Sequence, residues 1–266
     1  MLPLLILAEA AVLFLVQAVL RRNYPWLAWG VFGGLTLLLT PQWIGTHLSG
    51  EFPFVDCFAW VKQYTIQFCV CWVTALRFTS LGQHPWALRA TVLLLPINIL
   101  EAVVEDFGRD HEAHWLVAIS GVLLIVGIPN PERSLVLGSD SRREVSYEGV
   151  TRGWILEYTL WNWAFVFLNF PMLAAHHLAV LGVPLWIGMR EPRRWLLTRT
   201  YTLATHLLLM FTFPRLLVPT MDTTYWTTPQ RESMVSALCL ISMSSFVLRC
   251  VIRWQRPSPT HQHRPA

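Results

Sequence analysis

The chain has 266 residues, of which 54% are hydrophobic and only 14% charged, and its formal net charge at neutral pH is +4. This composition leaves too little polar surface to solvate a globular domain of that size, so a soluble catalytic domain is excluded and lipid is the expected solvent. The positive charge comes from arginines at the ends of apolar runs. This placement is typical of the loops of membrane proteins and favours that explanation over nucleic-acid binding. Five cysteines without a CxxC pair indicate neither a disulfide framework nor a zinc site.

Apolar stretches long enough to cross the hydrocarbon core of a bilayer follow one another along nearly the whole chain. They predict an all-α polytopic membrane helix bundle over residues 1–255, because they lack the period-2 alternation of barrel strands. Nine transmembrane helices are expected, or eight if the short fifth segment is re-entrant: 2–20, 26–44, 54–76, 86–104, 114–128, 153–170, 172–189, 196–213 and 233–252. A polar loop over residues 130–152 separates five spans from four, and the proline-rich residues 256–266 are expected to be a disordered cytosolic tail.

The placement of arginines in the loops tests this division independently. If the spans alternate in direction, one side of the membrane receives only Arg109, Arg215 and Arg231, and the other side receives the remaining loop and tail arginines. Because basic loops stay in the cytosol, we expect a multi-pass protein whose N-terminus is outside or lumenal and whose C-terminus is cytosolic.

Ionisable residues inside a span are the first place to look for function, because a charge at the bilayer centre costs about 3 kcal/mol. Asn98, Glu101 and Glu105 follow one another at helical spacing on one face of the fourth predicted helix, and Asp106 stands beside that face. A carboxyl group in this apolar setting favours its neutral form, which makes Glu101 a candidate general acid, oriented by Asn98. The alternative is that Glu101 only makes a hydrogen bond across a helix interface.

Lys62, in the third predicted span, is the only lysine of the chain. A lone lysine inside a span is expected to be neutral or paired, and Glu101 or Asp106 is the expected partner. In that case Lys62 and Asp106 would set the protonation of Glu101. The alternative is that the lysine side chain extends to the nearer membrane interface.

Aromatic and amide side chains gather in the sixth predicted span. Tyr158 and Asn162 share a helical face flanked by Trp161 and Phe165, and Trp60 stands on the third span. An aromatic wall with a few hydrogen-bonding groups is typical of a pocket for a large apolar ligand. We therefore expect these five residues to bind substrate, unless the aromatic ones merely belong to the interfacial belts of a membrane protein.

Two motifs are similar to known metal sites, but neither has the pattern that such a site requires. The segment His111-Glu112-Ala113-His114 and the pair His176-His177 lack the HxxxH and HxxHH spacings of membrane di-iron oxygenases. The acidic residues from Glu105 to Glu112 form a single cluster on the predicted non-cytosolic side, which disfavours a magnesium-diphosphate site. No metal and no organic cofactor are expected.

Several segments resemble a domain-of-unknown-function family of small multispan membrane proteins in bacteria and fungi. They are Trp60-Val61-Lys62-Gln63-Tyr64, Ala75-Leu76-Arg77, residues 97–107, residues 158–162 and Thr212-Phe213-Pro214. The resemblance implies a helical membrane fold but no activity, and it implies one site that contains Lys62, Arg77, Asn98, Glu101, Asp106, Tyr158 and Asn162.

In architecture, the chain also resembles the fungal membrane-bound terpene cyclases of meroterpenoid pathways. Those proteins are small and multispan, and they use intramembrane carboxylates as proton donors. The chain departs from them in its motif, because their asparagine and glutamate are four residues apart, whereas Asn98 and Glu101 are three apart without a tryptophan between them.

The leading hypothesis is an intramembrane enzyme of secondary metabolism, a terpene cyclase or isomerase in which Glu101 donates the starting proton to a lipophilic, isoprenoid-like substrate. The first alternative is a proton-coupled transporter built on Lys62, Glu101 and Asp106. The second is a non-catalytic accessory membrane protein. The expected partners are the small-molecule substrate, membrane lipid and other enzymes of the same pathway, and not nucleic acid.

Overall fold

The computed structural model describes residues 1–22, 24–50, 56–128, 135–139 and 142–255. Most of these residues lie in helices, so the all-α prediction is confirmed. The predicted tail over residues 256–266 and part of the predicted polar loop lie outside the described residues.

The long helices follow the predicted segments to within a few residues: α1 (Leu2–Leu20), α4 (Cys57–Phe78), α5 (Pro85–Phe107), α6 (Glu112–Val126), α7 (Arg152–Asn169), α8 (Ala174–Arg190), α9 (Trp195–Thr212) and α11 (Pro229–Gln255). The second predicted helix consists of α2 (Pro25–Ala28), the π-helical segment η1 (Trp29–Leu35) and α3 (Thr36–Leu48), which run on from one another. Short helical turns connect the others: η2 (Ser80–Gln83), η4 (Pro171–Leu173), η5 (Pro192–Arg194), α10 (Pro214–Leu217), η6 (Val218–Met221) and η7 (Thr224–Trp226).

Local sequence fixes where these helices begin. Pro85 stands at the start of α5, where its missing N–H removes no helical hydrogen bond. The side chain of Asp56 caps α4 by accepting a 2.8 Å hydrogen bond from the backbone amide of Ala59. The side chain of Thr151 caps α7 by accepting a 3.1 Å hydrogen bond from the backbone amide of Trp154. These caps anchor the two helices that carry Lys62 and Asn162.

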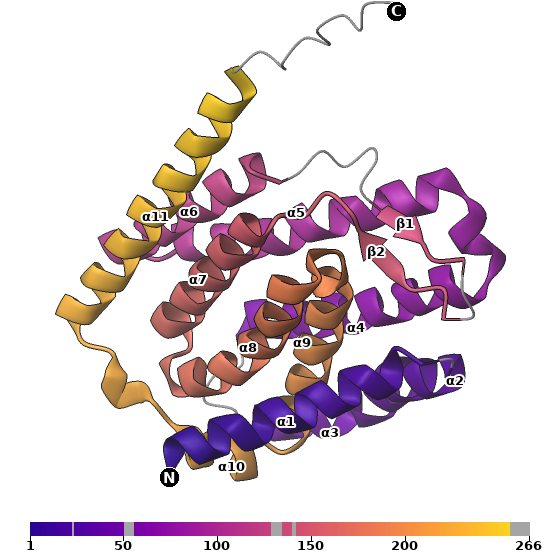
Figure 1. Cartoon of the computed structure of the whole chain (residues 1–266). Coiled ribbons are helices and arrows are strands. Elements are labelled where there is room, and N and C mark those ends of the chain that lie inside the picture. Colours follow the sequence, from indigo (N-terminus) through magenta and orange to yellow (C-terminus); the bar gives the residue numbers. More distant parts are fainter. Residues whose placement is uncertain (23, 51–55, 129–134, 140–141, 256–266) are drawn as a thin grey trace, which may run out of the picture.

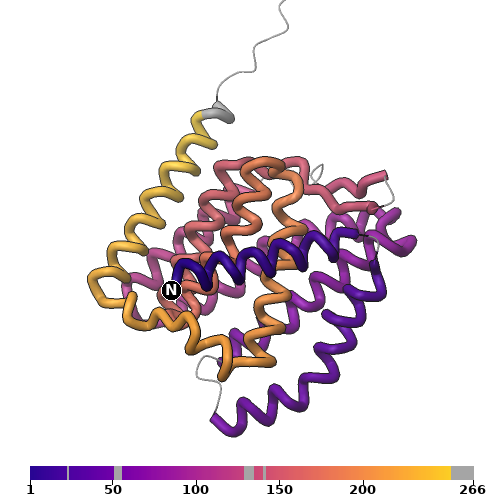
Figure 2. The backbone as a smooth tube through the Cα atoms, turned by 60° about the horizontal axis from the view of Figure 1, so that its bottom comes forward, coloured from indigo at the N-terminus to yellow at the C-terminus, as the bar shows by residue number. Residues whose placement is uncertain are grey.

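Helices α8 and α9 form the centre of the bundle (Figure 1). They pack against each other and against α1, while α7 contacts α8, and α4 contacts α9. Helix α5 contacts α4, α6 and α7, and α11 lies at the edge against α6 and α7. Figure 2 shows α1 crossing this centre, with the α2–α3 segment diverging from its end. Side chains from the first helix therefore meet side chains from residues 174–212.

A small hairpin closes one end of the bundle, where the sequence analysis expects only a polar loop. Strand β1 (Leu135–Leu137) pairs antiparallel with β2 (Val145–Tyr147), so that Leu135 lies opposite Tyr147. Burial raises the pKa of the Tyr147 phenol to about 12. A Cβ on Gly82 would lie 2.0 Å from the Leu76 carbonyl oxygen and 2.9 Å from Leu137, so only glycine fits beneath the hairpin. These two short strands depart from the all-α prediction, which holds for the rest of the described bundle.

In the described part of the chain, five helical segments are long and apolar enough to cross a membrane: Leu2–Leu20, Pro25–Leu48, Pro85–Phe107, Pro171–Arg190 and Pro229–Ile252. The pair Pro192–Thr212 and Pro214–Trp226, bent by 98°, would make a sixth. The predicted count of nine spans is therefore not supported. Helix α6 has only 15 residues, which is too short for a bilayer core. Helices α4 and α7 are less apolar because they carry buried polar side chains such as Gln63, Gln67 and Asn162.

Loops that the sequence assigns to one side of the membrane meet at one end of the bundle. Arg21, which follows α1, lies 2.5 Å from the carboxylate of Glu144, and Arg194, which precedes α9, lies 3.7 Å from the same carboxylate. A surface cavity of about 390 Å³ at this end is lined by arginines from separate loops, including Arg22, Arg142 and Arg190. These loops therefore lie together in the structure.

Candidate functional site

Lys62 and Glu101 form an ion pair between α4 and α5. The Lys62 Nζ lies 2.6 Å from Glu101 Oε2 and donates a second hydrogen bond, 3.0 Å long, to the backbone carbonyl of Asn98. The exposed fractions of the two side chains are 11% and 16%, so the pair is largely shielded. The amine is therefore held within the bundle by its predicted partner Glu101, and the expectation that it extends to the membrane interface does not describe this structure.

A cavity of about 70 Å³ lies beside this pair. Four of the predicted site residues line it, namely Lys62, Asn98, Asn162 and Phe165, whereas Glu101 stands behind Lys62 and does not line it. Most of the remaining wall is apolar, from α4, α5, α7, α8 and α9. The sequence analysis therefore identified both the pair and much of the wall that faces it.

Arg199 of α9 adds a charge that the sequence analysis did not assign to the site. Its side chain is 4% exposed, and its Nη2 donates to Asn162 Oδ1 at 3.3 Å. Its Nε and Nη1 have no hydrogen-bond partner, and no carboxylate lies within 4 Å of it among the described residues. An arginine in an apolar helix was the available signal, because such a charge requires a partner or a ligand.

A second, narrower cavity of about 50 Å³ adjoins the first. Asn98, Arg199 and Leu203 line both cavities, so these residues form the wall between them. Tyr158 lines the second cavity, with its ring 5.8 Å from the Arg199 guanidinium carbon. The guanidinium therefore stands where a polar group in either cavity can reach it.

Asp106 does not join this site. Its carboxylate lies 2.8 Å from His114 Nδ1 and accepts a hydrogen bond of 2.7 Å from Asn169 Nδ2. The residue is completely buried, and its Oδ2 has no partner among the described residues. The expectation that Asp106 acts on Lys62 or Glu101 is not met, because the next turn of α5 directs Asp106 toward α6 and α7.

The predicted aromatic residues are divided between the cavity and its surroundings. Phe165 lines the cavity and packs on Phe58, with ring centroids 5.2 Å apart. Trp161 is buried toward α6, where its Nε1 donates to the Val117 carbonyl at 3.0 Å. The Trp60 ring packs edge-on against Phe211 at 5.3 Å and does not line either cavity. Phe165 is therefore the predicted aromatic residue that faces this space most directly.

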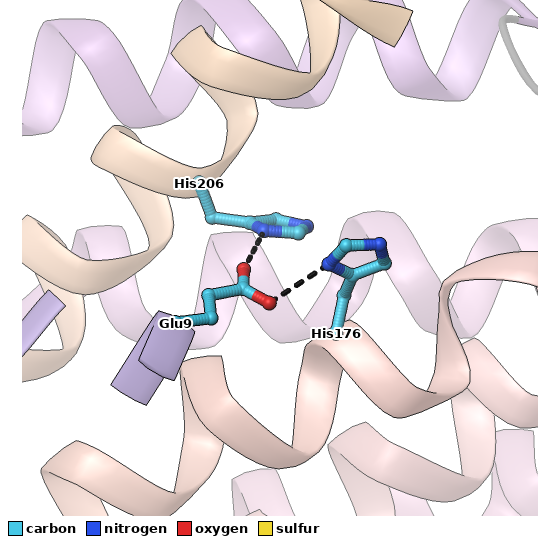
Figure 3. Close-up of side chains that lie close together, drawn as sticks. All are labelled: Glu9, His176 and His206. Atoms are coloured by element: carbon cyan, nitrogen blue, oxygen red, sulfur yellow. Dashed lines mark hydrogen bonds and ion pairs between the residues drawn. The ribbon is translucent and has the colours of Figure 1, made fainter. Parts of the chain in front are cut away.

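A second polar cluster, which the sequence analysis missed, joins α1, α8 and α9. The two carboxylate oxygens of Glu9 lie 2.8 Å from His176 Nδ1 and 3.1 Å from His206 Nδ1 (Figure 3). Glu9 is the only acidic residue among the first 50, and this was the signal that could have drawn attention to it. The partners of Glu9 could not be read from spacing, because they follow 167 and 197 residues later.

Comparison with known protein families finds one matching family. A model of a family of unknown function (DUF5692) matches residues 2–135 and 115–263. Searches of curated proteins and of solved structures found no match to the chain. Because the two matched segments together span nearly the whole sequence, the chain belongs to the family of unknown function DUF5692.

Proposed function

We propose that the protein is a multi-pass membrane enzyme that performs acid–base chemistry on a lipophilic small molecule, with its C-terminus in the cytosol. The carrying observation is the shielded Lys62–Glu101 pair, 2.6 Å long, beside an apolar cavity that also holds Arg199. A proton can be shared within the pair, while Arg199 offers free donors to a substrate oxygen.

The pair and the arginine have different tasks in this proposal. Arg199 and Asn162 bind an oxygen of the substrate, such as a carbonyl or an epoxide, and polarise it. The pair supplies a proton through Lys62, whose amine lines the cavity, and Glu101 holds this amine in place. The cationic intermediate then loses a proton, which returns to the Lys62 amine, so the substrate and the product have the same mass.

The reaction class we favour is cyclisation or isomerisation of an isoprenoid-like compound. The architectural likeness to membrane-bound terpene cyclases supports it, as do the rings of Phe58, Phe165 and Phe170, which surround the cavity and can face a developing positive charge. The cavity of about 70 Å³ is smaller than the several hundred Å³ of typical ligand pockets. Binding therefore requires these rings to move apart.

Mass spectrometry of lipophilic metabolites tests the proposal in a host that expresses the wild type or Glu101→Gln. Glu105→Gln is the matched control, because Glu105 lies one turn further on α5 and pairs with the exposed Arg109 at 2.5 Å. We expect a product of unchanged mass with the wild type and with the control, but not with Glu101→Gln. If Glu101→Gln formed as much product as the wild type, the Lys62–Glu101 pair would not take part in the reaction.

A proton-coupled transporter is the second candidate function, and one observation favours it. The helices Pro192–Thr212 and Pro214–Trp226 meet at 98°, and broken helices are typical of transport proteins that bind substrate at the break. Separate extracts of cells and medium distinguish the two functions. An enzyme converts one compound into another, whereas a transporter shifts the same compound from cells to medium.

A further inference from the structure

We propose that Glu9, His176 and His206 bind a divalent transition-metal ion of the zinc class. This inference is independent of the proposed function, and it revises the expectation that the protein needs no metal. The three residues come from α1, α8 and α9, and their candidate ligand atoms all lie within 4.8 Å of one another (Figure 3).

The spacing of the ligand atoms suits a metal. Glu9 Oε2 lies 2.8 Å from His176 Nδ1, and Glu9 Oε1 lies 3.1 Å from His206 Nδ1. Ligand atoms around a tetrahedral zinc ion, with bonds of about 2.0–2.1 Å, are roughly 3.3 Å apart. Small movements of the three side chains would therefore admit the ion.

The hydrogen bonding of His176 requires either a proton or a metal cation between its Nδ1 and the Glu9 carboxylate. Its Nε2 lies 3.2 Å from the Leu217 carbonyl oxygen, which can only accept, so Nε2 carries a hydrogen. In the neutral imidazole, Nδ1 is then an unprotonated acceptor that faces the acceptor oxygen of Glu9 at 2.8 Å. A metal ion between these two acceptor atoms would be bound by both of them. A metal-binding histidine usually donates a hydrogen bond from its other ring nitrogen to a group such as a backbone carbonyl, as Nε2 does here.

Burial and charge point the same way. The side chains of His176 and His206 are 2% and 1% exposed, and that of Glu9 is 18% exposed. Glu9 stands in α1, the most apolar of the five candidate spans of the described chain. A carboxylate in such surroundings needs a compensating charge, and a divalent ion supplies it.

The donor set selects the class of metal. Two imidazole nitrogens and one carboxylate oxygen suit zinc and its transition-metal neighbours, whereas magnesium and calcium prefer oxygen ligands throughout. Three protein ligands leave a coordination position open, as in catalytic zinc sites. The ring of His177 packs edge-on against the ring of His206, with centroids 5.1 Å apart, and His177 also lines the cavity beside Lys62. The proposed metal site is therefore separated from that cavity by the His177 side chain.

The test is the metal content of the full-length protein in detergent, measured by inductively coupled plasma mass spectrometry. We expect about one transition-metal ion per chain in the wild type and an occupancy at least about tenfold lower in Glu9→Gln and His206→Gln. His114→Gln is the matched control, because it removes the histidine of the other buried carboxylate contact, His114–Asp106. This control should keep the metal.

A titration of chelator-treated wild type with zinc chloride covers the case in which the variants fail to fold. We expect zinc to raise the thermal unfolding midpoint of the wild type at micromolar concentrations, and any folded Glu9→Gln protein to show no such rise. Wild-type protein that contains no metal and does not respond to zinc would overturn the proposal, because a shared proton would then account for the cluster.

Discussion

Two buried arginines in neighbouring helices have opposite surroundings. Arg77 of α4 is 1% exposed, and its guanidinium donates to carbonyl groups from the end of α1 and from Arg142, and to the Tyr201 hydroxyl, over 2.8–3.3 Å. Arg199 of α9 is almost as buried, yet two of its nitrogens have no partner in the described part of the chain. A buried donor without a partner costs free energy, so its retention points to a ligand. Arg77 therefore supports the fold, whereas Arg199 is available for binding.

The same contrast corrects what the family resemblance implies. That resemblance places Arg77 in one site with Lys62 and Glu101, but Arg77 lies at the hairpin end of the bundle and lines neither of the two adjoining cavities. Its contacts join the end of α1 to α4 and to the hairpin region. The residues of a sequence motif can thus serve separate purposes in one helix bundle.

Arg77→Met should have the largest effect on stability. It leaves several carbonyl groups, including those at the end of α1, without their donor, and each buried acceptor left without a partner costs about 1–3 kcal/mol. The free energy of unfolding in mixed micelles measures this loss. Arg89→Met, at an exposed position of α5, is the control and should change stability little. Equal stability of the two variants would contradict the structural assignment of Arg77.

Lys62→Met should destabilise the protein by about 3 kcal/mol, because it leaves the shielded Glu101 carboxylate without its partner. The double variant Lys62→Met/Glu101→Gln should recover most of this loss, since no uncompensated charge remains. Unfolding in mixed micelles compares the two. If the double variant is as unstable as the single one, packing of the lysine stem and not the ion pair holds the helices together.

Zinc should stabilise the wild type by about 2.7 kcal/mol when the free ion is present at a hundred times its dissociation constant. Glu9→Gln should show no such dependence, because the amide of glutamine cannot provide a charged ligand. Unfolding curves recorded with zinc and with a chelator measure the difference. Identical zinc dependence of the two proteins would show that the ion binds elsewhere.

Arg199→Met should change the free energy of unfolding by no more than about 1 kcal/mol, because the guanidinium makes a single weak bond to Asn162. It should nevertheless abolish the metabolite change that the wild type produces. Metabolite profiles and unfolding curves of the same variant check both statements. If Arg199→Met still formed product and lost as much stability as Arg77→Met, Arg199 would support the fold and would not bind the substrate.

Arg109→Met should have the smallest effect on stability. Its contacts with Glu105 and Asp56 lie at the surface, where Arg109 is 43% exposed, and exposed ion pairs contribute less than about 1 kcal/mol. Unfolding at low and high salt measures this contribution, which salt should diminish. A large loss of stability would mean that the end of α5 is held by this pair.

Several contacts of the site could be predicted from the sequence. A lone lysine in an apolar helix predicted an ion pair with Glu101 or Asp106, because an unpaired charge there is unfavourable, and the structure has the pair with Glu101. The positions of the long helices also followed from the lengths of the apolar stretches and the residues that interrupt them. The triad of Glu9, His176 and His206 could not be predicted, since its members share no spacing and meet only when α1 packs across α8 and α9.

The sequence by itself determined the apolar helices and the lipid-compatible composition, because helical hydrogen bonds and transfer of side chains into lipid depend on local residues. The tertiary structure decided which polar side chains meet, because the rotation of each helix about its axis depends on packing against neighbours that are distant in the chain. It thereby separated Asp106 from Glu101 on one helix and placed Arg199 beside Lys62. It also brought Glu9 to two histidines at the centre of the bundle.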